Sequence, residues 1–465
     1  MASSRKSSRS KPAAGDVTAR VAANIVAVVG SSARLVAGLS GGLDSVVLLD
    51  CLQRAARRRR FRLSALHVNH QLSPNAARWS AFCRRLCRAR GIPLESVKVT
   101  VPRGANVEAA ARAARHAVFA GQRCDYIVLA HHRDDQVETL MLQLLRGAGL
   151  KGLAAMPLVR KGKGERGKAK DRSSSILRPL LEVTRAEILD YARERGLKWI
   201  EDESNEDTRF RRNFLRHEVL PLIARRFPAF GATIARSARH IAEAGAVLDE
   251  VAAADGAAGI ADGSLAVDAL RRLPRARARN LLRFFLDGHG ASMPGAERLE
   301  EALRQALGAR GDSRMQVDLG DVELHRFRGR LRVVPRLPPV PRGYSRRWRG
   351  ERALVLPELG DVLSMTPSRG RGVSLARLRS GAVTIRVRRG GERLQPDCRR
   401  PRRSLKNLFQ EQRVPPWQRG RVPLIYCGED LVWTAGVGVD CRYQAVGGEP
   451  AIRPAWGTSK PARRP

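Results

Sequence analysis

The stretch LVAGLSGGLDSVVLLDCL, residues 35–52, decides the fold of the first part of this chain. Two apolar runs flank a pair of glycines, two serines and an aspartate. This pattern predicts a buried strand, a tight turn and then a helix. Such a turn gathers unpaired backbone N–H groups at the helix N-terminus, where an anion can bind. We therefore expect an anion site at residues 40–45.

The turn has the composition of a phosphate site, and its expected ATP-binding residues are Ser40, Gly41, Gly42, Leu43, Asp44 and Ser45. The glycines let the backbone approach phosphate oxygens without a Cβ in the way, and the serines can donate hydroxyl hydrogen bonds. Asp44 is an anion in an anion site, a conflict that Mg²⁺ carried by a nucleoside triphosphate resolves. A plain capped turn is the alternative, and it accounts less well for the Ser, Asp and Ser positions.

Strand-like and helix-like runs alternate around this turn. Strands are predicted at 34–40, 62–68, 94–101 and 125–130, and helices at 44–60, 75–91, 107–122 and 135–147. This alternation predicts an α/β fold with a doubly wound parallel sheet. Ligands of such sheets bind beyond the carboxyl ends of the strands, at the switch point.

The 465 residues are long enough for several domains. A first, nucleotide-binding domain is expected at 18–218, a mostly helical middle domain at 219–335 and a small mixed α/β domain at 345–447. Thr184–Glu187, TRAE, predicts a capped helix start. Residues 1–17 and 448–465 are expected to be disordered tails, the first without the apolar core of a signal peptide.

The charge points to a polyanionic partner, since Lys+Arg is 86 against 45 for Asp+Glu, a net +41. Part of this excess reflects a composition rich in Ala and Arg. Seven scattered cysteines are typical of the reducing cytoplasm, and Cys83 and Cys87 are expected to be core thiols. No apolar run reaches eighteen residues, so no membrane partner is expected.

Two other motifs resemble known sites and are rejected. GKGERGKA, residues 162–169, comes close to a P-loop, but Ala169 replaces the magnesium-binding hydroxyl and no strand leads in. Four histidines with Asp134 and Asp135 could suggest zinc, but their spacing does not support it. These histidines are His67, His70, His131 and His132. Packing and hydrogen bonding at the nucleotide pocket is the preferred interpretation, with His67 assigned to the ATP site.

Two further pairs remain open from pattern alone. Arg112 and Arg115 lie one helical turn apart and could reach phosphates or a target base, or form a solvated face. Asp135 and Glu138 share one helix face just beyond a predicted strand. They could hold ammonium groups or simply complement the helix dipole. Asp134 is expected to cap this helix.

SGGLDS resembles the signature of the N-type ATP pyrophosphatases, which split ATP between its α and β phosphates. Further segments narrow the resemblance to the tRNA(Ile)-lysidine synthetase family. They are ALHVNHQLSPNA (65–76), EAAARAARH (108–116), LAHHRDDQVETLMLQLLRGAGLKGLAAM (129–156), the segment 177–223, RRGGERLQP (388–396) and SLKNLFQEQRVPPWQRGRVPLIY (404–426). The likeness is strong over 34–225 and 383–440 and weaker between them. Gln71 departs from the family's usual glycine.

The resemblance implies a two-step reaction on the wobble cytidine of tRNA(Ile) with a CAU anticodon. ATP adenylates the oxygen on carbon 2 and releases pyrophosphate. The side-chain amine of free L-lysine then attacks that carbon and expels AMP. The product pairs with A, which changes codon and amino-acid identity from Met to Ile. Family members are often homodimers.

The resemblance also assigns roles. Catalytic roles are assigned to Asp44, Arg112 and Arg115 from their chemistry, and the resemblance implies lysine binding by Asp135 and Glu138. It implies contact with tRNA for Arg212, Asn213, Arg216, Arg389, Arg393 and Lys406. For Arg212 and Arg216 the alternative is local pairing with the acidic residues of 202–207. Trp417 and Phe409 could stack on RNA, although Phe409 is more typical of a core residue.

Two other functions compete. A tRNA thiolase with the same ATP loop needs a reactive cysteine pair or an iron–sulfur site, which nothing in the sequence clearly supplies. A non-catalytic basic RNA-binding protein would not need the complete SGGLDS turn.

Overall fold

The computed structural model describes residues 14–102, 107–162, 174–308 and 315–457. Residues 163–169 of the rejected P-loop-like segment and residues 1–13 of the expected basic tail lie outside these ranges. Contacts divide the chain into two compact units, Met1–Asp255 and Gly256–Pro465. In the described ranges, no helix combines the length and apolarity that a bilayer crossing requires.

The first unit is built on a six-stranded sheet with the order β3-β2-β1-β4-β6-β5. Its strands are β1 Arg34–Gly38, β2 Arg62–Asn69, β3 Leu94–Lys98, β4 Tyr126–Val128, β5 Val159–Arg160 and β6 Ser175–Leu177. All neighbouring pairs are parallel except β5 with β6. The predicted doubly wound parallel sheet is confirmed. The chain leaves β1 and β4, which are neighbours, in opposite directions, so the switch point lies at their carboxyl ends.

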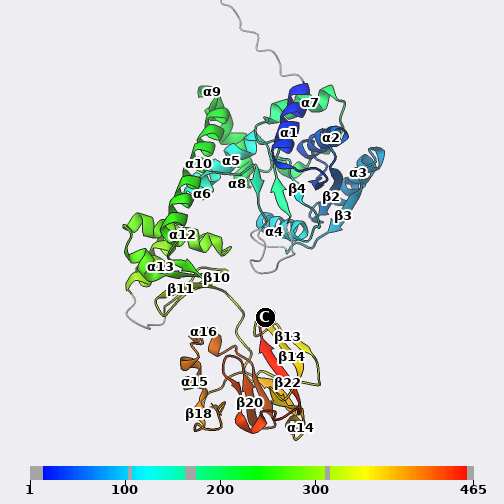
Figure 1. Ribbon diagram of the computed structural model, residues 1–465. Helices are drawn as coiled ribbons and strands as arrows, with labels where there is room; N and C mark the ends of the chain where they lie inside the picture. Colours follow the sequence, from blue (N-terminus) through cyan, green and yellow to red (C-terminus); the bar gives the residue numbers. More distant parts are fainter. Residues whose placement is uncertain (1–13, 103–106, 163–173, 309–314, 458–465) are drawn as a thin grey trace, which may run out of the picture. The chain divides into compact units, whose positions relative to one another are not determined.

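Helices cover both faces of this sheet. They are α1 Ala14–Val28, α2 Leu43–Arg58, α3 Ala76–Ala89, α4 Val107–Ala120, α5 Arg133–Leu144, α6 Leu150–Leu153 and α7 Arg185–Glu194. One core cluster joins α1, α2, α3 and α7 to the sheet, and a second joins α4. Figure 1 shows α4 on the other side of the strands from α1, α2 and α7.

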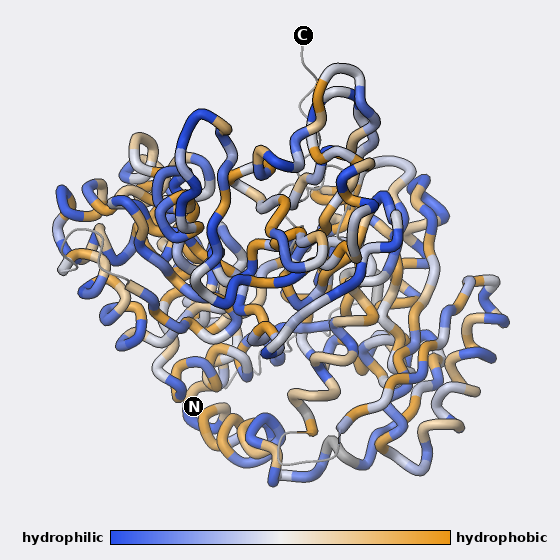
Figure 2. Tube along the Cα trace, turned by 90° about the horizontal axis from the view of Figure 1, so that it is seen from below, coloured by the Kyte–Doolittle hydropathy of each residue, from blue (hydrophilic) through white to orange (hydrophobic). Residues whose placement is uncertain are grey.

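Helix α1 corrects the predicted tail over residues 1–17, because it begins at Ala14. Val17, Val21 and Ile25 repeat every four residues and are 2%, 0% and 2% exposed. This spacing places them along one helix face, which packs against α2. Figure 2 shows the same alternation of hydrophobic and hydrophilic residues around the turns of the helices.

Gln71, the departure from the family pattern, has a left-handed backbone with φ of 56°. Its N–H donates to Asn69 Oδ1 at 2.8 Å, which closes the turn after β2. Glycine adopts this conformation without the penalty that a Cβ adds, so the turn's geometry explains the glycine usual in the family.

The first unit continues as a helical segment. It comprises α8 Arg211–Phe214, one π-helical turn Leu215–Val219, α9 Leu220–Arg226 and α10 Phe230–Gly256. A π-helical turn widens the helix locally and is often found at functional sites. Arg216 lies within this turn.

The first part of the second unit is mostly helical, as predicted, but it also contains a five-stranded sheet with the order β7-β8-β11-β10-β9. The helices are α11 Val267–Arg271, α12 Arg275–Gly288 and α13 Ala296–Gly308. The strands are β7 Ile260–Ala261, β8 Ser264–Ala266, β9 Gln316–Asp318, β10 Val322–Phe327 and β11 Arg330–Pro335. Apolar residues of both form one core.

The C-terminal part is rich in β-strands, in agreement with the expected mixed module. Two sheets have the orders β12-β16-β19-β20-β21 and β13-β14-β22-β15, and β17 pairs with β18. The strands are β12 Ser345–Arg347, β13 Ala353–Leu356, β14 Asp361–Arg369, β15 Val373–Ser374, β16 Val383–Arg386, β17 Arg393–Leu394, β18 Arg403–Ser404, β19 Leu424–Cys427, β20 Asp430–Thr434, β21 Gly438–Val439 and β22 Pro450–Trp456. The short helices are α14 Leu375–Leu378, α15 Leu405–Glu411 and α16 Pro416–Arg419.

Strand β22 shows that the predicted disordered tail over 448–465 is wrong for residues 450–456, whereas residues 458–465 lie outside the described ranges. It pairs antiparallel with β14 from Arg369↔Pro450 to Leu363↔Trp456. Ala451 and Ile452 are 2% and 5% exposed, so the strand contributes to the core. Two prolines and an arginine hide the strand signal in the sequence, and its partner lies about ninety residues earlier.

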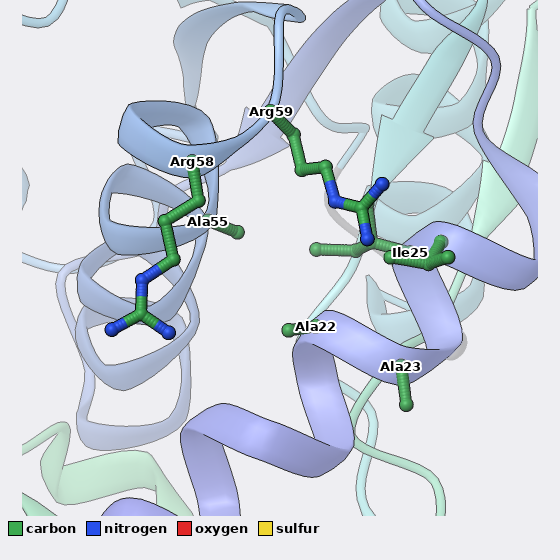
Figure 3. A pocket seen from close by; sticks show the side chains of 7 residues that line it. Ala22, Ala23, Ile25, Ala55, Arg58 and Arg59 are labelled. Atoms are coloured by element: carbon green, nitrogen blue, oxygen red, sulfur yellow. The ribbon is translucent and has the colours of Figure 1, made fainter.

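A pocket between α1 and α2 is shown in Figure 3, lined by Ala22, Ala23, Ile25, Val26, Ala55, Arg58 and Arg59. Helix α2 begins at the carboxyl edge of the sheet, and its 16 residues carry the chain about 24 Å toward the other edge. The pocket therefore lies away from the switch point and is not the candidate site.

Candidate active site at the switch point

The SGGLDS loop lies between β1 and α2, and its two serines hold its shape. Ser45 Oγ accepts the N–H of Gly41 at 3.1 Å and donates to the carbonyl of Gly42 at 2.9 Å. Ser40 Oγ accepts the N–H of Gly42 at 3.3 Å. Ser45 is buried, so its hydroxyl serves the loop itself, whereas Ser40 is exposed. Leu43 is a buried core residue, and only its backbone can serve a ligand.

The two glycines are needed for different reasons. Gly41 has φ of +94°, and a Cβ there would lie 2.8 Å from Ile200 Cδ1 and 3.2 Å from Cys83 Sγ. Gly42, the N-cap of α2, has φ of −72°. The nearest atom to a Cβ at Gly42 is Ser40 Oγ at 3.6 Å. The left-handed backbone therefore favours glycine at 41, whereas a Cβ at 42 would meet only ordinary contacts and the space there is open to a ligand.

We expect Gly41→Ala to lower the free energy of unfolding by about 2 kcal/mol, because a Cβ is strained in the left-handed backbone and the Ile200 side chain must move to admit it. Gly42→Ala is the matched control and should change stability by less than about 0.5 kcal/mol while weakening Mg-ATP binding. Calorimetric unfolding and ATP titration measure the two effects. Equal stability of both variants would contradict this assignment.

His67 supports the loop from beneath. It is 5% exposed. Its Nδ1 lies 2.9 Å from the carbonyl of Leu39 and its Nε2 lies 3.0 Å from Ser80 Oγ. Burial lowers the pKa of His67, so the ring is neutral at pH 7. Because both ring nitrogens are engaged by the protein, His67 positions the loop at residues 40–45.

Asp44 extends from the first turn of α2 beside His132 and Arg185. Its Oδ1 is buried and has no hydrogen-bond partner among the described residues. His132 Nε2 lies 3.8 Å from that oxygen, and Arg185 Nη1 lies 3.9 Å from Oδ2. Burial raises the pKa of Asp44, and this effect outweighs the opposing effects of His132 and Arg185. His132 and Arg185 therefore compensate the ionised carboxylate only in part.

These features fit a magnesium ion that arrives with a nucleotide. Mg²⁺ is commonly bound through one or two carboxylates together with substrate phosphates. Asp44 offers one such oxygen at the N-terminus of α2. Among the described residues, no group of three or more His, Cys, Asp or Glu side chains could hold a metal without a ligand's help.

His132 links the ATP loop to the carboxylates of α5. It is the N-cap of α5, and its N–H donates to Asp135 Oδ2 at 2.9 Å. Its Nε2 lies 3.6 Å from Asp135 Oδ2 as well as 3.8 Å from Asp44 Oδ1. Burial alone would lower the pKa of His132. Asp134, Asp135 and Asp44 raise it by more, so the pKa lies above its ordinary value.

The expectation that Asp134 caps α5 is wrong, because His132 and Asp135 form the capping interaction. Asp134 Oδ2 instead accepts the N–H of Arg185 at 2.9 Å, at the start of α7. Burial opposes ionisation, but His132 and the Arg185 N–H lower the pKa of Asp134 to about 2. The capping box predicted at Thr184 and Glu187 is confirmed.

Asp135 and Glu138 form a four-residue cluster with Arg212 and Arg216. Arg212 Nε donates to Glu138 Oε2 and Arg216 Nε to Oε1, both at 2.6 Å. Arg212 Nη2 also donates to Asp135 Oδ1 at 2.9 Å. Glu138 is 1% exposed. The structure thus joins the residues predicted to bind lysine to two of those predicted to bind tRNA.

Arg212 and Arg216 pair with Asp135 and Glu138, whereas the local alternative names the acidic residues of 202–207 as their partners. Asp207 pairs with Arg209 at 2.7 Å. Asn213 Nδ2 donates to the carbonyl of Asp207 at 3.0 Å.

Burial raises the pKa of Asp135, but His132 and Arg212 lower it more, so the carboxylate is ionised in this cluster.

The remaining predicted residues lie on α4 and in the C-terminal part. Arg112 is exposed and Arg115 half-buried on α4. Arg389, Arg393 and Lys406 are exposed in the C-terminal part, around β17, β18 and α15. Phe409 is 0% exposed, which confirms it as a core residue. Trp417 is half-buried.

Sequence reasoning missed three features at the carboxyl edge. His132 and Arg185 lie beside Asp44, and Arg178 is buried. The doubled histidine at 131–132 was expected to pack and hydrogen-bond at the nucleotide pocket, but no contact with Asp44 was predicted for His132. Arg178 directly follows β6 in an otherwise apolar segment, and a charged residue in that position is a usable signal.

Comparisons with known proteins agree with this architecture. Residues 16–223 match the model of a PP-loop domain. Residues 265–332 match the TilS substrate binding domain, and residues 383–456 match the TilS substrate C-terminal domain.

Several curated relatives span nearly the whole chain. A tRNA(Ile)-lysidine synthase from Nitrosomonas europaea is 44% identical over 453 residues, 96% of each chain. One from Azoarcus sp. is 42% identical, covering 92% of this chain and 93% of its own. One from Coxiella burnetii is 39% identical, covering 88% and 90%.

Proposed function

Because this chain belongs to the tRNA(Ile)-lysidine synthase family, we propose that it ligates L-lysine to carbon 2 of the wobble cytidine of tRNA(Ile) with a CAU anticodon. The reaction consumes ATP, forms a C–N bond and releases AMP and pyrophosphate. One observation carries the proposal: His132 lies within 4 Å of both Asp44 in the ATP loop and Asp135 in the carboxylate cluster. This arrangement supports the assignment of both half-reactions to one edge of the sheet.

The first half-reaction is assigned to the loop at residues 40–45. Backbone N–H groups at the start of α2 and the exposed Ser40 hydroxyl face the phosphates. Asp44 Oδ1 would hold Mg²⁺, which supplies charge neutralisation on the phosphates. Arg112 and Arg115 are assigned to the charge that develops as pyrophosphate leaves. Adenylation turns the cytosine oxygen into part of a phosphate leaving group.

The second half-reaction is assigned to Asp135 and Glu138. Two carboxylates suit a substrate with two ammonium groups, and one can accept the proton that the attacking amine must lose. The structure pairs both carboxylates with Arg212 and Arg216, which keeps a buried double negative charge neutral. Lysine must therefore share or replace these guanidinium contacts.

The RNA contacts form two groups. Arg212, Asn213 and Arg216 lie beside the carboxylates and are assigned to the anticodon region. The exposed Arg389, Arg393 and Lys406 are assigned to the tRNA body, most plausibly the acceptor stem, as for their family counterparts. We also propose that the protein forms a homodimer and acts in the cytoplasm.

The tRNA thiolase alternative needs a reactive thiolate near the ATP loop. Cys51, Cys83, Cys87 and Cys124 are all buried. Burial raises the pKa of Cys83 to about 12 and that of Cys87 to about 11. Thiols of this kind are unreactive at neutral pH.

We therefore expect iodoacetamide at pH 8 to label the exposed Cys398 of the native protein and to spare those four cysteines until it is denatured. Raised thiol pKa values leave almost no thiolate at this pH. Peptide mapping by mass spectrometry measures the labelling. Rapid labelling of Cys83 or Cys87 in the native protein would favour the thiolase.

The decisive assay incubates the protein with unmodified tRNA(Ile) transcript, ATP and labelled lysine. Lysine-dependent entry of label into the RNA, with one pyrophosphate per label, is the expected result. A transcript whose wobble cytidine is replaced by uridine is the matched control and should stay unlabelled. RNA binding without label or pyrophosphate would instead favour the non-catalytic alternative.

A further inference from the structure

Three arginines gather where β5, β6 and α4 meet at the carboxyl edge of the sheet. Arg178 directly follows β6 and is only 2% exposed. Its N–H donates to the carbonyl of Leu158 at 2.9 Å, which fixes its backbone beside β5. Arg160 is the last residue of β5, and Arg112 lies on α4.

The register of the strands places these side chains together. Arg160 is opposite Ile176 in the β5–β6 pair. Side chains alternate along a strand, so Arg160, Ile176 and Arg178 share one face. Ile176 packs with Phe119 of α4, so this is the face that α4 covers. Arg112 and Arg160 are both exposed, and the nearby charge of Arg112 adds to the effect of partial burial in lowering the pKa of Arg160.

The buried guanidinium of Arg178 has only neutral acceptors. Its Nε donates to His131 Nδ1 at 3.3 Å and its Nη1 to the carbonyl of Pro157 at 2.9 Å. In the ranges that the structure describes, no carboxylate forms an ion pair with Arg112, Arg160 or Arg178. Burial, then Arg160 and Arg112, lower the pKa of Arg178 to about 10, so it remains charged at pH 7.

The two neighbouring histidines, His116 and His131, are uncharged and do not change the charge balance of the cluster. Burial, reinforced by Arg112 and Arg160, lowers the pKa of His116 to about 4. Burial also lowers the pKa of His131 to about 3, with Asp135 opposing this effect and Arg178 adding to it. Both rings are therefore neutral at pH 7. The cluster holds three positive charges, one of them buried, which is unfavourable unless an anion joins it.

We infer that Arg112, Arg160 and Arg178 form a phosphate-binding site, with Arg178 held in place by His131 and the carbonyl of Pro157. This inference rests on the proposed function, and it adds Arg160 and Arg178 to the substrate-binding residues. Guanidinium groups bind phosphate oxygens in bidentate fashion. Two sources present that chemistry here: an RNA phosphodiester next to the target nucleotide, and the pyrophosphate that leaves ATP.

The test compares Arg160→Gln and Arg178→Gln with Arg62→Gln. Arg160 is exposed, so its variant is expected to fold, and it carries the test alone if Arg178→Gln does not. Arg62 is an exposed arginine of the same sheet that begins β2, at the opposite edge. Two quantities are measured: the Kd of unmodified tRNA(Ile) transcript over a salt series, and the inhibition constant of inorganic pyrophosphate in the labelling assay.

If the source is RNA, each cluster variant should raise the transcript Kd about 10-fold and reduce the salt slope by about one ion. The pyrophosphate inhibition constant should then stay unchanged. If the source is pyrophosphate, its inhibition constant should rise about 10-fold instead. The inference is overturned if both quantities stay within about 2-fold of the Arg62→Gln control in every folded cluster variant.

The wild-type protein separates this result from the proposed function. Failure of the wild type to label the transcript with lysine would overturn the proposed function. The transcript Kd and direct calorimetric titration with pyrophosphate would still report on the arginine site. Normal wild-type labelling with unaffected variants would overturn only the arginine site.

Discussion

Asp44→Asn should reduce pyrophosphate release by about 10³-fold, the largest effect expected of a single substitution in this chain. The buried Oδ1 of Asp44 has no partner among the described residues, and we assign it to the magnesium that accompanies ATP. Asparagine keeps the shape of the side chain and removes its charge. Pyrophosphate release per mole of enzyme, with saturating transcript and lysine, measures the loss.

The same substitution should raise thermal stability. Burial raises the pKa of Asp44 in the folded protein, so the folded state holds this proton more tightly than the unfolded state. The folded protein therefore loses stability as pH rises from the pKa of Asp44 in the unfolded state through its pKa in the folded state. Asparagine removes that cost at neutral pH. Pyrophosphate release should therefore fall while the lowest unfolding temperature measured by calorimetry rises.

Asp268→Asn is the control for this experiment. Its side chain is 74% exposed in an i,i+3 pair with Arg271, where a lost charge has little effect. Both activity and stability should stay near those of the wild type. Transcript affinity should also be nearly unchanged in Asp44→Asn. A fall in pyrophosphate release of less than 10-fold would remove Asp44 from the catalytic step.

Glu138→Gln should lower the free energy of unfolding by about 3 kcal/mol and raise the KM for lysine at least about 10-fold. Glu138 is 1% exposed and accepts from both Arg212 and Arg216 at 2.6 Å. The variant leaves two guanidinium groups with one carboxylate between them. Calorimetric unfolding and lysine titration of the labelling assay measure the two effects.

A second variant separates the stability effect from lysine binding. Glu138→Gln with Arg216→Gln removes one charge of each sign, so part of the stability should return while the lysine KM stays high. Glu182→Gln is the control, since its pair with Arg239 is 3.2 Å long and exposed on both sides. A destabilised Glu138→Gln with normal lysine use would make the cluster purely structural.

Local patterns explain which parts of the fold could be predicted. The strand, double glycine and helix at 35–52 and the capping box at Thr184 depend on neighbours within a few residues, and the structure confirms both. Strand β22 could not be predicted in this way. Its hydrogen bonds run to β14, and two prolines suppress its own propensity. Helix α1 was hidden by the polar residues before it, although Val17, Val21 and Ile25 already carried its period.

The candidate site divides along the same line. The sequence by itself determined which groups are present: an amide-rich turn with one aspartate, two carboxylates one helical turn apart, and an RNxxR segment. Only the tertiary structure decided that Arg212 and Arg216 neutralise Asp135 and Glu138, and that His132 stands between them and Asp44. The physical reason is that hydrogen bonding within a turn depends on nearby residues, whereas the charge balance of a buried cluster depends on residues more than seventy positions apart.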